Sequence, residues 1–327
     1  MDFDLSQDQQ EIKTVARELL AARSPWAKVR EAADAREYGD ALWRELAELG
    51  WPGIAVAEEH GGQGLGAVEL AVLVEELGYA CAATPFLSTA VAASVIGACG
   101  TDEQRERHLP ALAAGEATAG VGTRELCADG AGAAVLVLLD GDEAELVEGA
   151  EAEPLDVIDS TRRYASVTGG SGEPLGPGAA DRVRAAVAAE VVGLCQQALD
   201  MTLAYVKDRK QFGVPVGSFQ AVAHRCAQML LSTETARSTA YFAAWAADAD
   251  PERLPEAAAL AGAAAADGGR EVTASAIQAH GGIGFTWEAD VHWLYKRAQL
   301  DTVLLGGAGR HRAALCRIAA GRVGVTA

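Results

Sequence analysis

The sequence lacks the patterns that would place the chain in a membrane, outside the cell or on nucleic acid. No apolar run approaches the length of a membrane span, although half of the residues are hydrophobic. The start, Met1-Asp2-Phe3-Asp4, is acidic and has no basic segment, which argues against a signal peptide. The formal net charge of −19 disfavours DNA and anionic membranes, because both require a basic surface.

Closely spaced cysteines are also missing. The six cysteines are scattered, with no Cys-x-x-Cys and no zinc-ligand spacing. Most of them stand in alanine-rich apolar segments, which is typical of small core residues in a reducing compartment. We therefore expect a cytoplasmic protein without a metal site, in which any anionic ligand must be met by local arginines.

Alanine-rich segments with helical periodicity predict a mainly α-helical chain in three parts. Residues 1–118 are expected to form an N-terminal helical domain, with capping boxes at Ser6–Gln9 and Thr101–Gln104. Residues 119–179 form a small β-domain, and residues 180–327 form an antiparallel four-helix bundle. The expected strands are at about 134–139, 145–147 and 163–167, and the bundle helices at about 180–209, 218–246, 255–279 and 287–319.

The stretch from Arg209 to Gln220 joins two of these helices and has the features of an anion site. Glycine and proline alternate in its centre, which indicates a turn, and Ser218 is expected to cap the second helix. Arg209 would end one helix and Gln220 would begin the next, so both would lie near the same corner of the fold. A guanidinium beside free backbone N–H groups suits a phosphate or diphosphate. The alternative is that Arg209 only complements the end of its own helix.

A second glycine-rich segment, Gln278-Ala279-His280-Gly281-Gly282-Ile283-Gly284-Phe285-Thr286, lies downstream. Together with Arg209-Lys210-Gln211-Phe212-Gly213 and the following Phe219-Gln220, it resembles the signatures of the acyl-CoA dehydrogenase family. The N-terminal helices share the resemblance, whereas the middle of the chain does not match well. The resemblance implies an acyl-CoA dehydrogenase-like fold, FAD as the cofactor, and α,β-desaturation of an acyl-CoA thioester.

In this family the adenosine diphosphate of the flavin lies across a subunit interface. The resemblance therefore implies a half-site that this chain offers to a neighbouring chain. Arg209 would form a bidentate contact with the diphosphate, and paired glycines would let the backbone approach it closely. For the glycine segment, the alternative is an ordinary turn that ends a helix. The implied cofactor contacts are Arg209, Phe212, Gln220, Gln278, Gly281 and Gly282.

The resemblance also implies a catalytic carboxylate that this chain does not supply. One family position for the base falls within residues 303–308 and the other at Val183, and neither holds Asp or Glu. Glu190 is a weak candidate for a displaced base, and we expect it to be an ordinary solvated or paired helical carboxylate. Asp301 is equally doubtful, and His60 is expected to be a turn residue. The two flavin-ring loops of the family are absent from a β-domain of about half the family length.

With these departures, the chain resembles the short non-catalytic subunit of heteromeric bacterial acyl-CoA dehydrogenases, which are best known from steroid side-chain β-oxidation. The resemblance implies an α2β2 heterotetramer with a full-length catalytic chain, an acyl-CoA substrate and an electron-transfer flavoprotein as acceptor. A steroid side-chain CoA ester is one candidate substrate. Two alternatives stay open: a structural or acyl-CoA-binding subunit without flavin contact, and an independent homo-oligomeric dehydrogenase with an unrecognised base.

Overall fold

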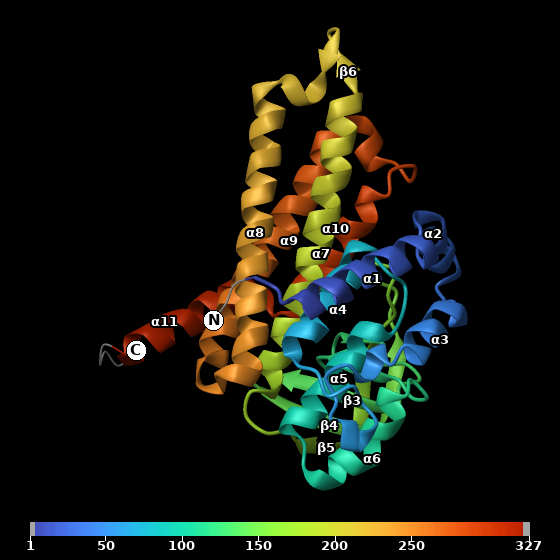
Figure 1. Ribbon diagram of the computed structural model, residues 1–327, viewed down its shortest axis with the longest axis vertical. Coiled ribbons are helices and arrows are strands. Elements are labelled where there is room, and N and C mark those ends of the chain that lie inside the picture. Colours follow the sequence, from blue (N-terminus) through green and yellow to red (C-terminus); the bar gives the residue numbers. More distant parts are fainter. Residues whose placement is uncertain (1–3, 323–327) are drawn as a thin grey trace.

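The computed structural model describes residues 4–322, which are mainly α-helical as predicted (Figure 1). Residues 1–3 belong to the acidic start on which the argument against a signal peptide rests, and they lie outside the described residues. Within residues 4–322, no helix combines the length and the apolar character needed to cross a membrane.

The N-terminal part is helical, and both predicted capping boxes are confirmed. The hydroxyl of Ser6 accepts the N–H of Gln9 at 3.2 Å, and the hydroxyl of Thr101 accepts the N–H of Gln104 at 3.2 Å. Each pair satisfies backbone donors that a helix start leaves free, so each fixes where its helix begins. The helices are α1 (Gln7–Arg23), α2 (Trp26–Ala35), α3 (Asp40–Glu48), α4 (Ala67–Tyr79), α5 (Phe86–Cys99) and α6 (Asp102–Ala113).

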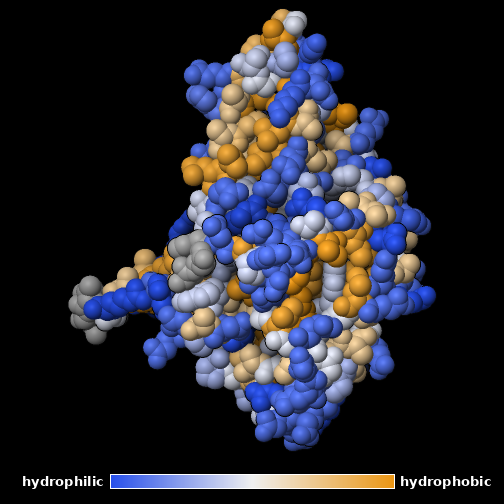
Figure 2. Space-filling view, viewed as in Figure 1, coloured by the Kyte–Doolittle hydropathy of each residue, from blue (hydrophilic) through white to orange (hydrophobic). Residues whose placement is uncertain are grey.

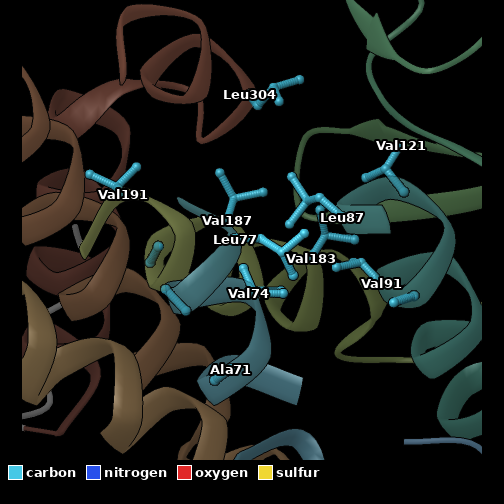
Figure 3. Close-up of a cluster of buried hydrophobic side chains, with 14 of the residues drawn as sticks. Ala71, Val74, Leu77, Leu87, Val91, Val121, Val183, Val187, Val191 and Leu304 are labelled. Atoms are coloured by element: carbon cyan, nitrogen blue, oxygen red, sulfur yellow. The ribbon is translucent and has the colours of Figure 1, made fainter. Parts of the chain in front are cut away.

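Helices α2 and α5 were not predicted. In α5 every residue from Phe86 to Ile96 is buried, so the segment has no polar face and no helical periodicity to detect. Figure 3 shows why: Leu87 of α5 points toward Leu77 of α4 and Val183 of the first bundle helix. The N-terminal domain is thus joined to the bundle through a dry core.

The middle of the chain is a small closed barrel with the strand order β1-β2-β5-β4-β3. Strand β1 runs parallel to β3, and the other pairs are antiparallel. The predicted turn at Asp140-Gly141 is confirmed, and Gly141 has a φ of 62° there. The strands are β1 (Ala119–Gly122), β2 (Cys127–Ala128), β3 (Val135–Asp140), β4 (Glu143–Pro154) and β5 (Tyr164–Pro174), of which β1 and β2 were not predicted.

Long helices with short connections form the C-terminal part, as predicted. The close approach of these helices depends on small residues. A Cβ at Gly193 of the first bundle helix would lie 1.9 Å from the carbonyl oxygen of Glu75 on α4. The elements are α7 (Ala179–Asp208), β6 (Lys210–Gln211), β7 (Val214–Pro215), α8 (Gln220–Ala249), α9 (Leu254–His280), α10 (Val291–Leu304) and α11 (Gly307–Arg322), with short 3-10 turns between some of them.

The prediction of a single last helix from about 287 to 319 was wrong. The helix breaks between α10 and α11, because Gly306 and Gly307 have φ values of 82° and 75°, outside the helical region. Figure 1 shows α11 leaving the bundle and running away from the body of the molecule. Its base is held by His311, whose Nε2 lies 2.8 Å from the carbonyl oxygen of Leu305.

Candidate half-site at the end of the bundle

The first signature forms a hairpin at the tip of the bundle. Helix α7 ends at Asp208, and Arg209 takes an extended conformation while its N–H still donates to the carbonyl of Tyr205 at 2.8 Å. Strands β6 and β7 then pair through a two-residue turn at Phe212 and Gly213, whose φ values are 52° and 81°. Positive φ at both positions defines the turn that suits a tight hairpin. A bulky side chain rarely adopts such a conformation, so Phe212 is held in a strained position.

The expected cap at Ser218 was wrong. Ser218 lies in a 3-10 turn, and its hydroxyl donates to the carbonyl of Pro215 at 2.7 Å instead of receiving a helix N–H. The residue before α8 is Phe219, which has no capping side chain. Within residues 4–322, the N–H groups of Gln220 and Ala221 have no hydrogen-bond acceptor. The start of α8 therefore presents free backbone donors, which suits an anion better than the predicted cap would have done.

The second signature lies at the same end of the bundle, because α9 ends beside α7. The ring of His280, the last residue of α9, stacks on Tyr205 of α7 with centroids 4.5 Å apart. Its Nδ1 lies 2.7 Å from the carbonyl oxygen of Ala276, and burial lowers the pKa of His280. Tyr205 precedes Arg209 by one helical turn. The two signatures, far apart in sequence, are thus brought together as the resemblance implied.

The glycines after α9 leave an open surface. Gly281 has a φ of 65°, and a Cβ built at Gly281 or Gly282 would meet no atom within 4 Å. Gly284 is different, since a Cβ there would lie 2.4 Å from the carbonyl oxygen of Ile277. Gly284 therefore closes the turn against α9, whereas Gly281 and Gly282 leave room for another molecule to approach the backbone. Gln278 is exposed on the last turn of α9.

The tip is exposed and locally cationic. The side chain of Phe212 is 94% exposed, although it meets Phe219 edge-on at 6.2 Å. The guanidinium of Arg209 makes no hydrogen bond or ion pair with any other described residue, and Lys207 and Lys210 flank it. A cationic tip on a chain of net charge −19 fits an anionic ligand such as the diphosphate of FAD.

Neither family position for the catalytic base holds an acid, and the residues at or near these positions include buried apolar ones. Val183 and Leu305 are each 1% exposed. In Figure 3, Val183 lies beside Val187 of α7 and Leu77 of α4, within the hydrophobic core. The nearest charged neighbour on α7, Arg184, is held by the carboxylate of Asp181 at 3.0 Å. Neither position therefore offers a carboxylate facing a substrate.

Glu190 was expected to be solvated or paired, and the structure shows it paired but not solvated. It is 2% exposed and accepts hydrogen bonds from Arg162 of the β4–β5 loop and Arg297 of α10. Asp301 is fully buried and accepts from Arg162 at 3.1 Å. Asp159 accepts from Arg297 at 2.5 Å. We call Asp159, Arg162, Glu190, Arg297 and Asp301 the buried ionic cluster.

The carboxyl groups of this cluster differ in protonation. Burial would raise the pKa of Glu190, but Arg162 and Arg297 hold that pKa below its usual value. Burial and the neighbouring Glu190 charge raise the pKa of Asp301 well above its usual value. Asp301 is thus the member of the pair that binds a proton more readily, and the two guanidinium groups face the carboxyl groups of Glu190 and Asp159. No periodic pattern in the sequence indicates this cluster, because its members come from three separate segments.

His60 is the last residue of a 3-10 turn, Glu58–His60, ahead of the glycine-rich loop. It is half-buried, with Nε2 3.8 Å from a carboxylate oxygen of its neighbour Glu59. No group of three or more His, Cys, Asp or Glu residues within residues 4–322 is arranged to hold a metal ion.

Comparison with known proteins identifies the family. The family model described as "Acyl-CoA dehydrogenase, N-terminal domain" matches residues 6–116, and the one described as "Acyl-CoA dehydrogenase, C-terminal domain" matches residues 170–319. Acyl-CoA dehydrogenase IpdE2 of Mycolicibacterium smegmatis is 36% identical over 298 residues, covering 90% of this chain and 93% of that protein.

Solved structures agree with this assignment. A variant of the Tcur3481-Tcur3483 steroid ACAD has a TM-score of 0.86 and 28% identity, covering 97% of this chain and 99% of that chain. The ChsE4-ChsE5 complex from Mycobacterium tuberculosis shares the fold, with a TM-score of 0.86 at 24% identity, over 98% of this chain and 99% of that chain. The chain therefore belongs to the acyl-CoA dehydrogenase family of FAD-dependent oxidoreductases that act on CH–CH bonds.

Proposed function

We propose that this chain is the non-catalytic subunit of a heteromeric acyl-CoA dehydrogenase and supplies the FAD-diphosphate half-site to a catalytic partner. One observation carries the proposal. The residues that would contact the diphosphate are gathered and exposed at one end of the bundle, whereas neither Val183 nor any residue from 303 to 308 is an Asp or Glu. FAD, when bound, accepts the hydride that leaves the β-carbon of the acyl group. Here the residues of this chain only bind and orient its diphosphate.

The proposed contacts with the cofactor differ in their chemistry. The Arg209 guanidinium offers two parallel N–H donors and the N-terminus of α8 offers backbone donors, both of which suit phosphate oxygens. Gly281 and Gly282 leave space for the cofactor beside the backbone, and Gln278 and Gln220 are exposed amides able to donate to it. Phe212 would pack on the cofactor from the hairpin.

The interior supports the absence of a complete active site. Desaturation needs a carboxylate to remove the α-proton, and such a base must reach the substrate. Glu190 and Asp301 are buried within the ionic cluster, where arginines or a proton neutralise them. The β-domain is the short barrel described above and carries neither flavin-ring motif of the family. We therefore assign proton abstraction to the partner.

An exposed apolar surface next to the half-site supports a partner chain. Figure 2 shows hydrophobic residues gathered on the upper part of the bundle, where α7 and α8 run to the tip. On α8, Leu230 and Leu231 are 50% and 59% exposed, and Phe285 beyond α9 is 84% exposed. Side chains of this kind are typical of a surface that is covered in an assembly.

The proposed assembly is an α2β2 heterotetramer that takes an acyl-CoA substrate and passes electrons to an electron-transfer flavoprotein. A steroid side-chain CoA ester is the proposed substrate, since one structural relative is described as a steroid ACAD.

Co-purification tests the proposal. The chain is produced alone and together with the product of a neighbouring acyl-CoA dehydrogenase gene, and flavin absorbance and turnover are measured. We expect yellow colour and activity only in the co-purified complex. Yellow colour and turnover from the chain alone would favour an independent dehydrogenase. A complex that forms without flavin would favour a purely structural or acyl-CoA-binding subunit.

Arg209→Ala tests the half-site itself, with Lys207→Ala as the matched control on the preceding turn. A desolvated charge-assisted contact is worth about 1.5–3 kcal/mol, so we expect FAD affinity of the complex to fall about ten- to a hundredfold. The control removes a neighbouring exposed cation and should leave the affinity within about threefold. Equal FAD affinity in wild type and Arg209→Ala would show that the half-site is assigned wrongly.

A further inference from the structure

A second cationic cluster, which the half-site does not use, lies at the start of α10. It consists of Trp287, His292, Trp293 and Lys296, and we call it the indole cluster. The Nζ of Lys296 lies 4.2 Å from the ring centroid of Trp287 and 4.4 Å from that of Trp293. The ring of His292 lies 5.0 Å from Trp287 and 4.4 Å from Trp293. One ammonium group is therefore held between two indole faces beside an imidazole.

Three polar atoms in this cluster are buried without a partner. Both ring nitrogens of His292 and the indole nitrogen of Trp293 have no hydrogen bond to any residue from 4 to 322. These side chains are only 9% and 5% exposed. Leaving a buried donor without an acceptor costs about 1–3 kcal/mol, so native structures rarely do so without a reason. Three such atoms in contacting rings are therefore candidates for hydrogen bonds to a ligand.

Lys296 also makes no ion pair with any described residue, and Asp159 is the acid that acts on its charge. No carboxylate of the described residues lies within 4.0 Å of its Nζ. Two acidic residues of neighbouring segments are already paired with arginines: Asp290 with Arg30 at 2.5 Å, and Asp159 with Arg297 at 2.5 Å. Burial lowers the pKa of Lys296, and burial followed by the Lys296 charge lowers the pKa of His292 to about 4. Near neutral pH His292 is thus a neutral imidazole, which lies beside the amine of Lys296 and the buried indole N–H of Trp293.

We propose that the indole cluster binds an oxyanion, either a phosphate or a carboxylate group of a small-molecule ligand. The ammonium of Lys296 and the N–H of Trp293 are donors, and neutral His292 can add one more. Because the available groups are mainly donors around a positive charge, an oxygen acceptor with negative charge complements them better than a cation or an amide. Access comes from the outer side, where Trp287 is 73% exposed and Lys296 is half-buried.

The experiment follows the indole N–H signals of the six tryptophans in a ¹⁵N-labelled full-length chain, in complex with its partner if it requires one. The Trp293 signal is assigned by its loss in Trp293→Phe or, if that variant does not fold, by its through-space contacts with His292. Sodium pyrophosphate represents phosphate ligands and succinate represents carboxylate ligands. We expect one of them to move the Trp293 signal downfield in a saturable titration.

Lys296→Met keeps the apolar stem on the indoles and removes only the charge. We expect it to weaken the response of Trp293 at least about tenfold, the effect of losing one charge-assisted contact. Arg209→Ala is the control, and it should leave that response unchanged because Arg209 belongs to the half-site. A response to pyrophosphate alone identifies a phosphate ligand, and a response to succinate alone identifies a carboxylate. The proposal is overturned if neither probe moves the Trp293 signal, or if Lys296→Met responds like wild type.

Discussion

The buried ionic cluster gives a pair of nearly isosteric substitutions whose effects on stability should differ sharply. Glu190→Gln removes the carboxylate that accepts from both Arg162 and Arg297. Two buried guanidinium groups then lose their shared counter-charge, and breaking such a pair typically costs about 3–5 kcal/mol. Asp301→Asn replaces an acid that already carries a proton. Its amide oxygen still accepts from Arg162, so we expect a cost below about 1 kcal/mol.

The assay is urea denaturation of both variants and the wild type at one protein concentration, because partner binding makes apparent stability concentration-dependent. We expect Glu190→Gln to lose at least about 2 kcal/mol more than Asp301→Asn. The large expected loss follows from Glu190 being paired and buried rather than solvated. Equal losses, or a larger loss for Asp301→Asn, would refute the assignment of the proton to Asp301. Turnover per bound flavin in Glu190→Gln should stay within a few-fold of wild type, since losing a true base costs about a hundredfold or more.

Other expected outcomes rest on single positions. Because the folded-state pKa of Asp301 is raised, its stabilising contribution is present at low pH and is lost as pH rises through that pKa. Asp301→Asn should therefore gain stability relative to wild type as the pH rises above the usual carboxyl range, in denaturation curves measured at a series of pH values. Gly193→Ala should lower the free energy of unfolding by about 2 kcal/mol or more, because the new methyl group pushes α7 away from Glu75. Gly97→Ala should raise it by about 0.5–1 kcal/mol, because a Cβ there meets no atom closer than 3.9 Å. The thermal midpoints of the two variants test both expectations. Phe212→Gly should remove the strain of a bulky residue at positive φ, so the thermal midpoint should not fall. The flavin-to-protein ratio of the complex should fall, because the ring that would pack on the cofactor is lost.

Local chemistry could be predicted from the sequence where a few neighbouring residues determine the structure. The capping boxes at Ser6 and Thr101 and the turn at Asp140 depend on contacts within four residues, and each was confirmed. The predicted cap at Ser218 was wrong although it is also local, because the Ser218 hydroxyl donates to the carbonyl of Pro215 and the helix begins one residue later, after Phe219. The break at Gly306 was missed because a glycine inside a periodic segment can also stay helical.

In the candidate site, too, local features could be predicted and long-range pairings could not. The residues of the half-site were named from motifs, and the structure brings them to one end of the bundle, but their contacts with a cofactor stay a prediction. The buried ionic cluster could not be predicted, because Arg162 and Asp301 are 139 residues apart and Glu190 and Arg297 are 107 apart. Pairing over such distances is decided by tertiary packing, and no periodicity in any one segment records it.

The same separation has a consequence for how the protein is made. Asp159 leaves the ribosome 138 residues before Arg297, the partner that neutralises it in the core. At about 5–20 residues per second, that interval lasts roughly 7–30 seconds. During it, Arg162 of the β4–β5 loop can already pair with Glu190 of α7, but the carboxylate of Asp159 is still without Arg297. The contact between the barrel and the first bundle helix is therefore completed only when α10 has been synthesised.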